Sequence, residues 1–222
     1  MATGAELTYQ TNATALQMAN TIFGDGTVVV GASYTGPNAS KAIYSNGQLS
    51  PGVVPSTTGI ILSTGNANNF TQSNGDPNRA TGTTTDTNSV NNNALFNAVA
   101  GTNTYDAVWL DVDFIPTGNV MTMQFVLSSE EYPENNLSHF NDTVGVWING
   151  SHVPISVGTD LSGAANLDTA NQPILNNSNT HDTFITEMDG FTQTLSLTIP
   201  VNMGQVNSLR IGITDTKEAC YG

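Results

Sequence analysis

Acidic and amide side chains gather in one stretch of the second half of the chain. The run Ser128-Ser129-Glu130-Glu131-Tyr132-Pro133-Glu134 follows an apolar segment, and Phe140-Asn141-Asp142 precedes another. If both apolar segments are strands of one sheet, the intervening loop brings carboxylates together at one end of that sheet. Calcium takes about six to eight oxygen ligands, for which Asp, Glu, Asn and backbone carbonyls are suitable donors. The pattern predicts a calcium site, and a solvated acidic loop explains it equally well.

The individual ligands differ in how well their positions suit the ion. Glu130 and Glu131 are neighbours, so in a strand they point to opposite faces, and only one ligates directly unless a bulge redirects the other. Asn141 and Asp142 complete the central set. Asp189, in the run Asp189-Gly190-Phe191-Thr192, lies at a strand boundary, although Asp-Gly is more often turn chemistry. Asp215 ends another apolar run and could reach a shared site at the same sheet end.

Catalytic patterns are absent from the sequence. It has no GxSxG, HExxH, Walker or Rossmann motif. Neighbouring glutamates on a strand do not flank a sugar bond as glycosidase carboxylates do. His139, His152 and His181 are scattered and have no cysteine partners, so we interpret them as surface residues rather than zinc ligands. Asp111 and Asp113 share one strand face, where facing water is a simpler interpretation than binding a cation. We therefore expect a protein that is not an enzyme.

Charge and composition restrict the partners. Four Lys and Arg residues stand against 18 Asp and Glu residues, which gives a formal net charge of -14. This balance repels nucleic acids and anionic membranes and favours divalent cations. Cys220 is the single cysteine, which we interpret as a free, inert thiol. No apolar run reaches the roughly 18 residues of a membrane span, and the first residues lack signal-peptide features, so a secreted protein would have lost its signal.

The elements that would position these residues are mostly strands. Apolar residues at helical spacing predict a helix over 15–23, capped by Thr11 or Asn12, and a second short helix with Leu95, Phe96 and Val99 on one face. Strands are expected over 27–30 and 59–63 and, from period-two alternation, over 108–114, 121–127, 144–148, 195–199 and 209–213. Residues 67–93 are rich in Asn, Thr, Gly and Asp, which predicts a surface loop. Together they predict one all-β domain over 1–222, a β-sandwich or jelly roll with one or two short helices.

At these motifs the sequence resembles the bacterial choice-of-anchor L domain family, whose members join an extracellular domain to varied C-terminal anchoring signals. The most specific part is the acidic run 128–134 together with Asn141-Asp142. The other matching stretches, which extend the resemblance over most of the chain, are Ala13-Thr14-Ala15-Leu16 through Phe23-Gly24-Asp25-Gly26, Gly59-Ile60-Ile61-Leu62-Ser63-Thr64-Gly65, Val112-Asp113-Phe114-Ile115-Pro116, Asp189-Gly190-Phe191-Thr192 and Leu209-Arg210-Ile211-Gly212-Ile213-Thr214-Asp215.

The resemblance implies a secreted or surface-displayed bacterial protein in an adhesin-like or matrix-like context, and it makes the acidic motif residues better cation candidates. It supplies no defined ligand or activity. Such domains usually continue beyond the equivalent of Asp215 into another strand, whereas this chain stops at Gly222. We therefore expect the final strand to be missing or contributed by another molecule, and we expect self-association through the open sheet edge.

Three functions remain open at this point. The leading one is an extracellular module for adhesion or assembly, stabilised by calcium. The second is a carbohydrate-binding, lectin-like module, which exposed aromatic residues near the acidic loop, such as Tyr132 or Trp147, would favour. The third is a hydrolase of extracellular polymers, in which Glu130 would be required for activity.

Overall fold

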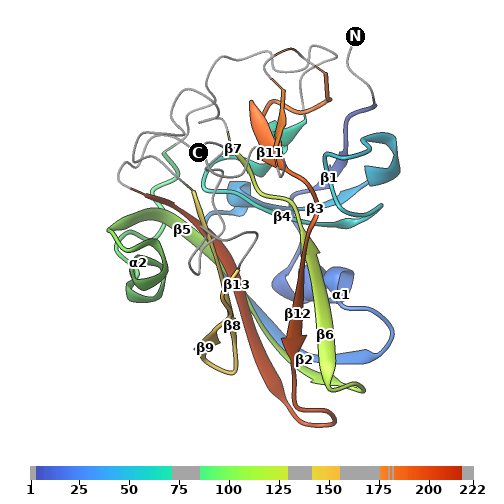
Figure 1. Cartoon of the computed structure of the whole chain (residues 1–222), viewed down its shortest axis with the longest axis vertical. Helices are drawn as coiled ribbons and strands as arrows, with labels where there is room; N and C mark the ends of the chain where they lie inside the picture. The colour runs from blue at the N-terminus through green and yellow to red at the C-terminus, as the bar shows by residue number, and fades with distance from the viewer. Residues whose placement is uncertain are drawn as a thin grey trace.

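The computed structural model describes residues 4–71, 86–129, 142–155, 176–179, 181 and 183–216. In these residues the protein is mostly β, with several antiparallel sheets and two short α-helices (Figure 1). The prediction of a β fold with one or two short helices is confirmed.

The largest sheet has five strands in the order β2-β5-β13-β8-β9, and all neighbours in it are antiparallel. Its strands are β2 (Thr27–Thr35), β5 (Thr104–Pro116), β8 (Thr143–Ile148), β9 (Ser151–His152) and β13 (Asn207–Thr216). The strand that carries Asp215 therefore lies inside the sheet, between β5 and β8. Among the described strands, β2 and the short β9 form its edges.

Three smaller sheets complete the β structure. One has the order β1-β3-β4, a second has the order β10-β11-β7, and β12 pairs with β6 alone. Their strands are β1 (Thr8–Gln10), β3 (Lys41–Ser45), β4 (Gly59–Leu62), β6 (Val120–Phe125), β7 (Ser128–Ser129), β10 (Asn176–Ser178), β11 (Gly190–Thr192) and β12 (Leu195–Pro200). Short 3-10 helices, η1 (Asn38–Ser40), η2 (Gly47–Leu49) and η3 (Ala67–Phe70), connect parts of the first half.

The main core lies against one face of the five-stranded sheet. Period-two alternation along β5 buries Leu110, Val112 and Phe114 on this face. They pack with Ile199 and the other inward residues of the β6–β12 pair, and with Met18 of α1 (Ala15–Ile22). Phe23 lies beside Phe114, with ring centroids 4.7 Å apart. In Figure 1, α1 and the β6–β12 pair are seen on the same side of this sheet.

The N-terminus of α1 differs from the prediction. Thr14, rather than Thr11 or Asn12, is the N-cap, because its hydroxyl accepts from the backbone N–H of Gln17 at 3.2 Å. The Gln17 side chain accepts in return from the backbone N–H of Thr14 at 2.8 Å. This reciprocal capping box satisfies two helix-end donors, so it defines the start of the helix.

The second helix, α2 (Ala94–Ala100), covers part of the opposite sheet face. Phe96 is buried between Trp109 and Trp147, with ring centroids 6.0 and 5.1 Å away. One prediction is wrong here, because Leu95 does not share the buried face of Phe96 and its side chain is 42% exposed. Trp147, whose exposure would have favoured a lectin-like module, is 5% exposed within this cluster.

The long polar segment is only partly a loop. Within 67–93, η3 buries Ala67, and Val90 forms an isolated bridge with Ala107 of β5. None of the helices in the described residues is long and apolar enough to cross a bilayer.

Candidate metal centre

Asp142 and Asp215 meet where β8 and β13 end side by side. The register of this antiparallel pair runs from Leu209 opposite Ile148 to Thr214 opposite Thr143. Asp215 directly follows Thr214 and Asp142 directly precedes Thr143, and the side chains of the two aspartates are hydrogen bonded to each other. The predicted convergence of these two carboxylates at one end of a sheet is therefore present in the structure.

Both carboxyl groups are withdrawn from water. Asp142 is 6% exposed and Asp215 is 4% exposed. Burial raises the pKa of Asp142 to about 6, although hydrogen bonds with Asp215 and Ser129 oppose the shift. Burial and then the negative charge of Asp142 raise the pKa of Asp215 well above its ordinary value. Without a cation, the raised pKa values of both groups favour one proton held between the two carboxyl groups.

Two hydroxyl groups join the pair from other sheets. Ser129, at the end of β7, hydrogen bonds to Asp142, and Thr64, just after β4, hydrogen bonds to Asp215. The Thr64 carbonyl also accepts from the hydroxyl of Thr87 at 2.9 Å. Since β4, β7 and the β8–β13 pair belong to three different sheets, the cluster lies at a junction of sheets. We call these four residues, Thr64, Ser129, Asp142 and Asp215, the junction cluster.

One oxygen of each carboxyl group has no partner. Within the described part of the chain, Oδ1 of Asp142 and Oδ1 of Asp215 are buried and accept no hydrogen bond. An unsatisfied buried oxygen is costly, and two of them in contacting side chains are unusual in a folded protein. A hard cation that prefers oxygen ligands would satisfy both.

A third carboxylate nearby already accepts hydrogen bonds from backbone N–H groups. Asp106 of β5 is buried, with a left-handed φ of 47°, and its side chain accepts from the backbone N–H groups of Ser89 at 2.8 Å and Thr87 at 3.4 Å. Its negative charge adds to the rise in the pKa of Asp215. Nowhere in the described residues do three or more Asp, Glu, His or Cys side chains form a group able to hold a metal.

The other predicted ligands have different outcomes. Glu130, Glu131 and Asn141 lie outside the described residues, as do Tyr132, His139 and Cys220. Asp189 is buried and immediately precedes Gly190, which pairs with Ser129 across β11 and β7. Its backbone carbonyl accepts from Asn179 at 2.7 Å.

The two hydroxyl partners of the carboxyl pair were missed at the sequence level. Thr64 belongs to the run Gly59-Ile60-Ile61-Leu62-Ser63-Thr64-Gly65, and Ser129 is the second residue of the acidic run, but nothing in their types marks them as partners of carboxylates. The histidines need one correction. His181 is exposed, whereas His152 is partly buried beside Trp147, with ring centroids 5.7 Å apart, and burial lowers its pKa.

The fold and this cluster define a mostly antiparallel β protein with a buried carboxyl pair where its sheets meet. A family model for the choice-of-anchor L domain matches residues 7–222, and the chain belongs to that family. Membership indicates a secreted or surface-anchored protein module. Neither curated proteins nor solved structures provided a match.

Proposed function

We propose that the chain is an extracellular module for adhesion or assembly whose fold is stabilised by calcium bound at the junction cluster. The observation that carries the calcium part is the pair of contacting, buried carboxyl groups, each with one oxygen that has no hydrogen-bond partner among the described residues. Hydrogen bonds within the pair satisfy only the remaining oxygens, and they require a retained proton.

The donor set favours calcium over softer metals. The junction cluster offers only oxygens, from two carboxylates and two hydroxyl groups, and a net charge of -14 attracts cations to the chain. Calcium needs about six to eight oxygens, so further ligands are required. Glu130 and Glu131 follow Ser129 directly in the chain, and Asn141 directly precedes Asp142. We propose that these residues, together with water, complete the coordination.

The position of the cluster suggests what the ion does. A cation held by Asp142 and Asp215 would replace their mutual repulsion with attraction. Because Thr64 and Ser129 come from two further sheets, it would also tie three sheets together. An ion that binds only the folded state stabilises it by mass action. The role is therefore structural, and nothing in the cluster suggests a reaction.

The surface role rests on family membership. The family indicates a secreted or anchored module, and a calcium-dependent fold suits an environment where calcium is abundant. Adhesion and assembly are our extension of that context. They are tested by binding of the labelled, calcium-loaded protein to cells of the source bacterium and by sedimentation velocity over a concentration series. Absence of both cell binding and association would overturn this part of the proposal.

Thermal melting tests the calcium site. The protein is first stripped with EDTA, and elemental analysis confirms that no metal is retained. Melting is then repeated with millimolar calcium and, separately, with magnesium. Stabilisation of about 2.7 kcal/mol is expected when calcium is at a hundred times its dissociation constant. Magnesium is expected to act weakly because it demands a tighter octahedral site. A melting temperature that is the same with and without calcium would overturn the proposal.

A further inference from the structure

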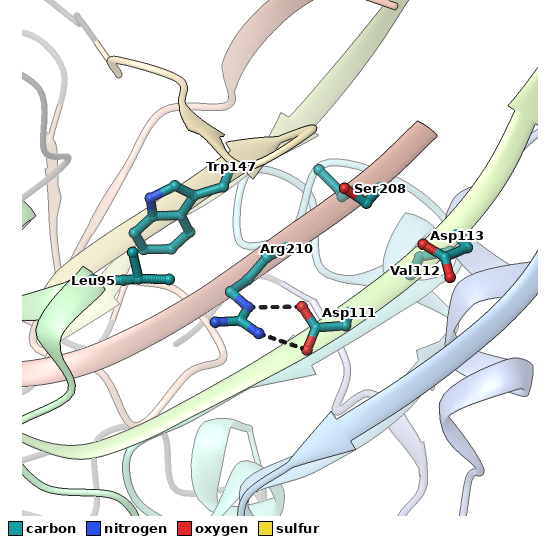
Figure 2. A pocket seen from close by; sticks show the side chains of 9 residues that line it. Leu95, Asp111, Val112, Asp113, Trp147, Ser208 and Arg210 are labelled. Carbon is teal, nitrogen blue, oxygen red and sulfur yellow. Dashed lines mark hydrogen bonds and ion pairs between the residues drawn. The ribbon is translucent and has the colours of Figure 1, made fainter. Parts of the chain in front are cut away.

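A second polar cluster lies on the outer face of the five-stranded sheet, beside α2. It lines a pocket of about 350 Å³, within the range of about 300–1,000 Å³ typical of ligand pockets. Figure 2 shows Leu95 and Trp147 at one end of the pocket, Asp113 and Ser208 at the other, and Arg210 with Asp111 between them. The Cα partners Arg210 and Asp111 belong to β13 and β5, which bring them to the same face.

The centre of the pocket is held in place by several contacts. Nε and Nη2 of Arg210 donate to the two carboxylate oxygens of Asp111, at 2.7 and 3.0 Å. The indole N–H of Trp109 also donates to Asp111, at 3.1 Å, and the guanidinium of Arg210 lies 5.1 Å from the centre of the Trp109 ring. A bidentate pair stacked on an aromatic ring has few alternative geometries. Its remaining polar atoms are therefore presented in a fixed arrangement.

Three groups around this centre have unused hydrogen-bonding capacity. Asp113 and Ser208 are exposed Cα partners on neighbouring strands. Asp111 takes Nε and Nη2 of Arg210, which leaves Nη1 for a ligand, and the Asp113 and Ser208 side chains are open to solvent. The pocket thus offers an acceptor, a donor and a group that does both, next to the apolar surfaces of Leu95 and Trp147.

We propose that this pocket binds a neutral sugar unit of an extracellular polysaccharide. Hydroxyl groups on adjacent sugar carbons both donate and accept, which matches a carboxylate, a guanidinium edge and a hydroxyl held close together. The charge argues against acidic polysaccharides, because Asp111 already neutralises Arg210 and Asp113 leaves the pocket negative. An extended peptide would gain no strand pairing here, since β5 and β13 are paired on both sides.

Both tryptophans of the chain belong to this region, so intrinsic fluorescence reports on it directly. Trp109 contacts Arg210, and Trp147 lines the pocket. The protein, in calcium-containing buffer, is titrated with neutral gluco-, manno-, galacto- and N-acetylglucosamine oligosaccharides and with acidic ones. A saturable change with at least one neutral sugar, and none with acidic sugars, is expected.

Variants then locate the binding. Asp113→Ala and Ser208→Ala are expected to weaken binding about tenfold each, and both positions are exposed, so the fold is retained. Ser196→Ala, at an exposed serine of β12, is the matched control and is expected to bind normally. Absence of neutral-sugar binding, binding of acidic sugars only, or equal affinity in all three variants would overturn the proposal. The titration is repeated in EDTA, and neutral-sugar binding that persists there would show that the pocket acts independently of the calcium site.

Discussion

Replacing Asp142 by asparagine is expected to change stability in opposite directions with and without calcium. In the metal-free protein, folding raises the pKa of Asp142 from 3.8 to about 6. Each pKa unit corresponds to about 1.36 kcal/mol. Near neutral pH, keeping Asp142 ionised in its buried position therefore costs the folded state about 3 kcal/mol. The neutral amide of Asp142→Asn avoids this cost.

The variant loses part of the hydrogen bonding that the carboxylate makes, which contributes about 1 kcal/mol. The metal-free variant is thus expected to be about 2 kcal/mol more stable than the wild type. For a chain of this size, about 1 kcal/mol shifts the melting temperature by roughly 2–4 °C, so the expected rise is roughly 4–8 °C. With saturating calcium the order reverses, because the wild type gains about 2.7 kcal/mol or more that the variant largely forfeits.

Differential scanning fluorimetry in EDTA and in millimolar calcium measures both effects on the same samples. Asp86→Asn is the matched control, because Asp86 is exposed and its Oδ1 accepts from the backbone N–H of Asn88, a contact that asparagine can keep. It is expected to behave like the wild type in both buffers. The reasoning is refuted if Asp142→Asn lowers the metal-free melting temperature while calcium leaves the wild type unchanged. The pair would then be an ordinary hydrogen-bonded carboxyl pair.

Three further predictions follow from other features. In EDTA, the free energy of unfolding should rise as pH falls from about 7.5 to 5.5. The reason is that the raised pKa values of Asp142 and Asp215 make the folded state bind more protons than the unfolded state. A fall in the urea midpoint over this pH range would contradict the assignment. Gly212→Ala should destabilise by roughly 1–3 kcal/mol, because its Cβ would lie 2.5 Å from a backbone oxygen of β5, whereas Gly24→Ala meets nothing within 4 Å and should be neutral in urea unfolding. Val30→Lys, on edge strand β2, should reduce any concentration-dependent association in analytical ultracentrifugation, and a sharp wild-type monomer at high concentration would count against assembly through this edge.

The sequence predicts strands well where one face of a strand is buried. Along β5, buried Leu110, Val112 and Phe114 alternate with Trp109, Asp111 and Asp113, and this period of two is visible without any tertiary information. The first residue of α1 was harder to predict from the sequence, because whether Thr11, Asn12 or Thr14 caps the helix depends on side-chain geometry rather than residue type.

Tertiary contacts account for most of what the sequence could not predict. The alternation along β8 places Trp147 on the sheet face that points away from the core residue Val146, so the sequence alone is consistent with an exposed indole. In the structure, α2 covers that face and buries the indole against Phe96. Likewise, their positions at the ends of predicted strands suggested that Asp142 and Asp215 share a site. The hydroxyl of Thr64, which hydrogen bonds to Asp215 from 151 positions away in the chain, could not be predicted in this way. Such distant residues come together only where the separate sheets meet.

Without a bound cation, the junction cluster is energetically costly for the folded state. Apolar side chains of similar volume could fill the site without the cost of charge burial, and replacing buried ionic groups in this way is often neutral or stabilising. Here the chain instead places two carboxyl groups in contact, and an oxygen of each has no partner in the part of the chain that the structure describes. A retained proton relieves the repulsion but not the two unsatisfied oxygens. The cation that we propose would relieve both, so an arrangement that is costly in the metal-free protein would become stabilising with the ion bound.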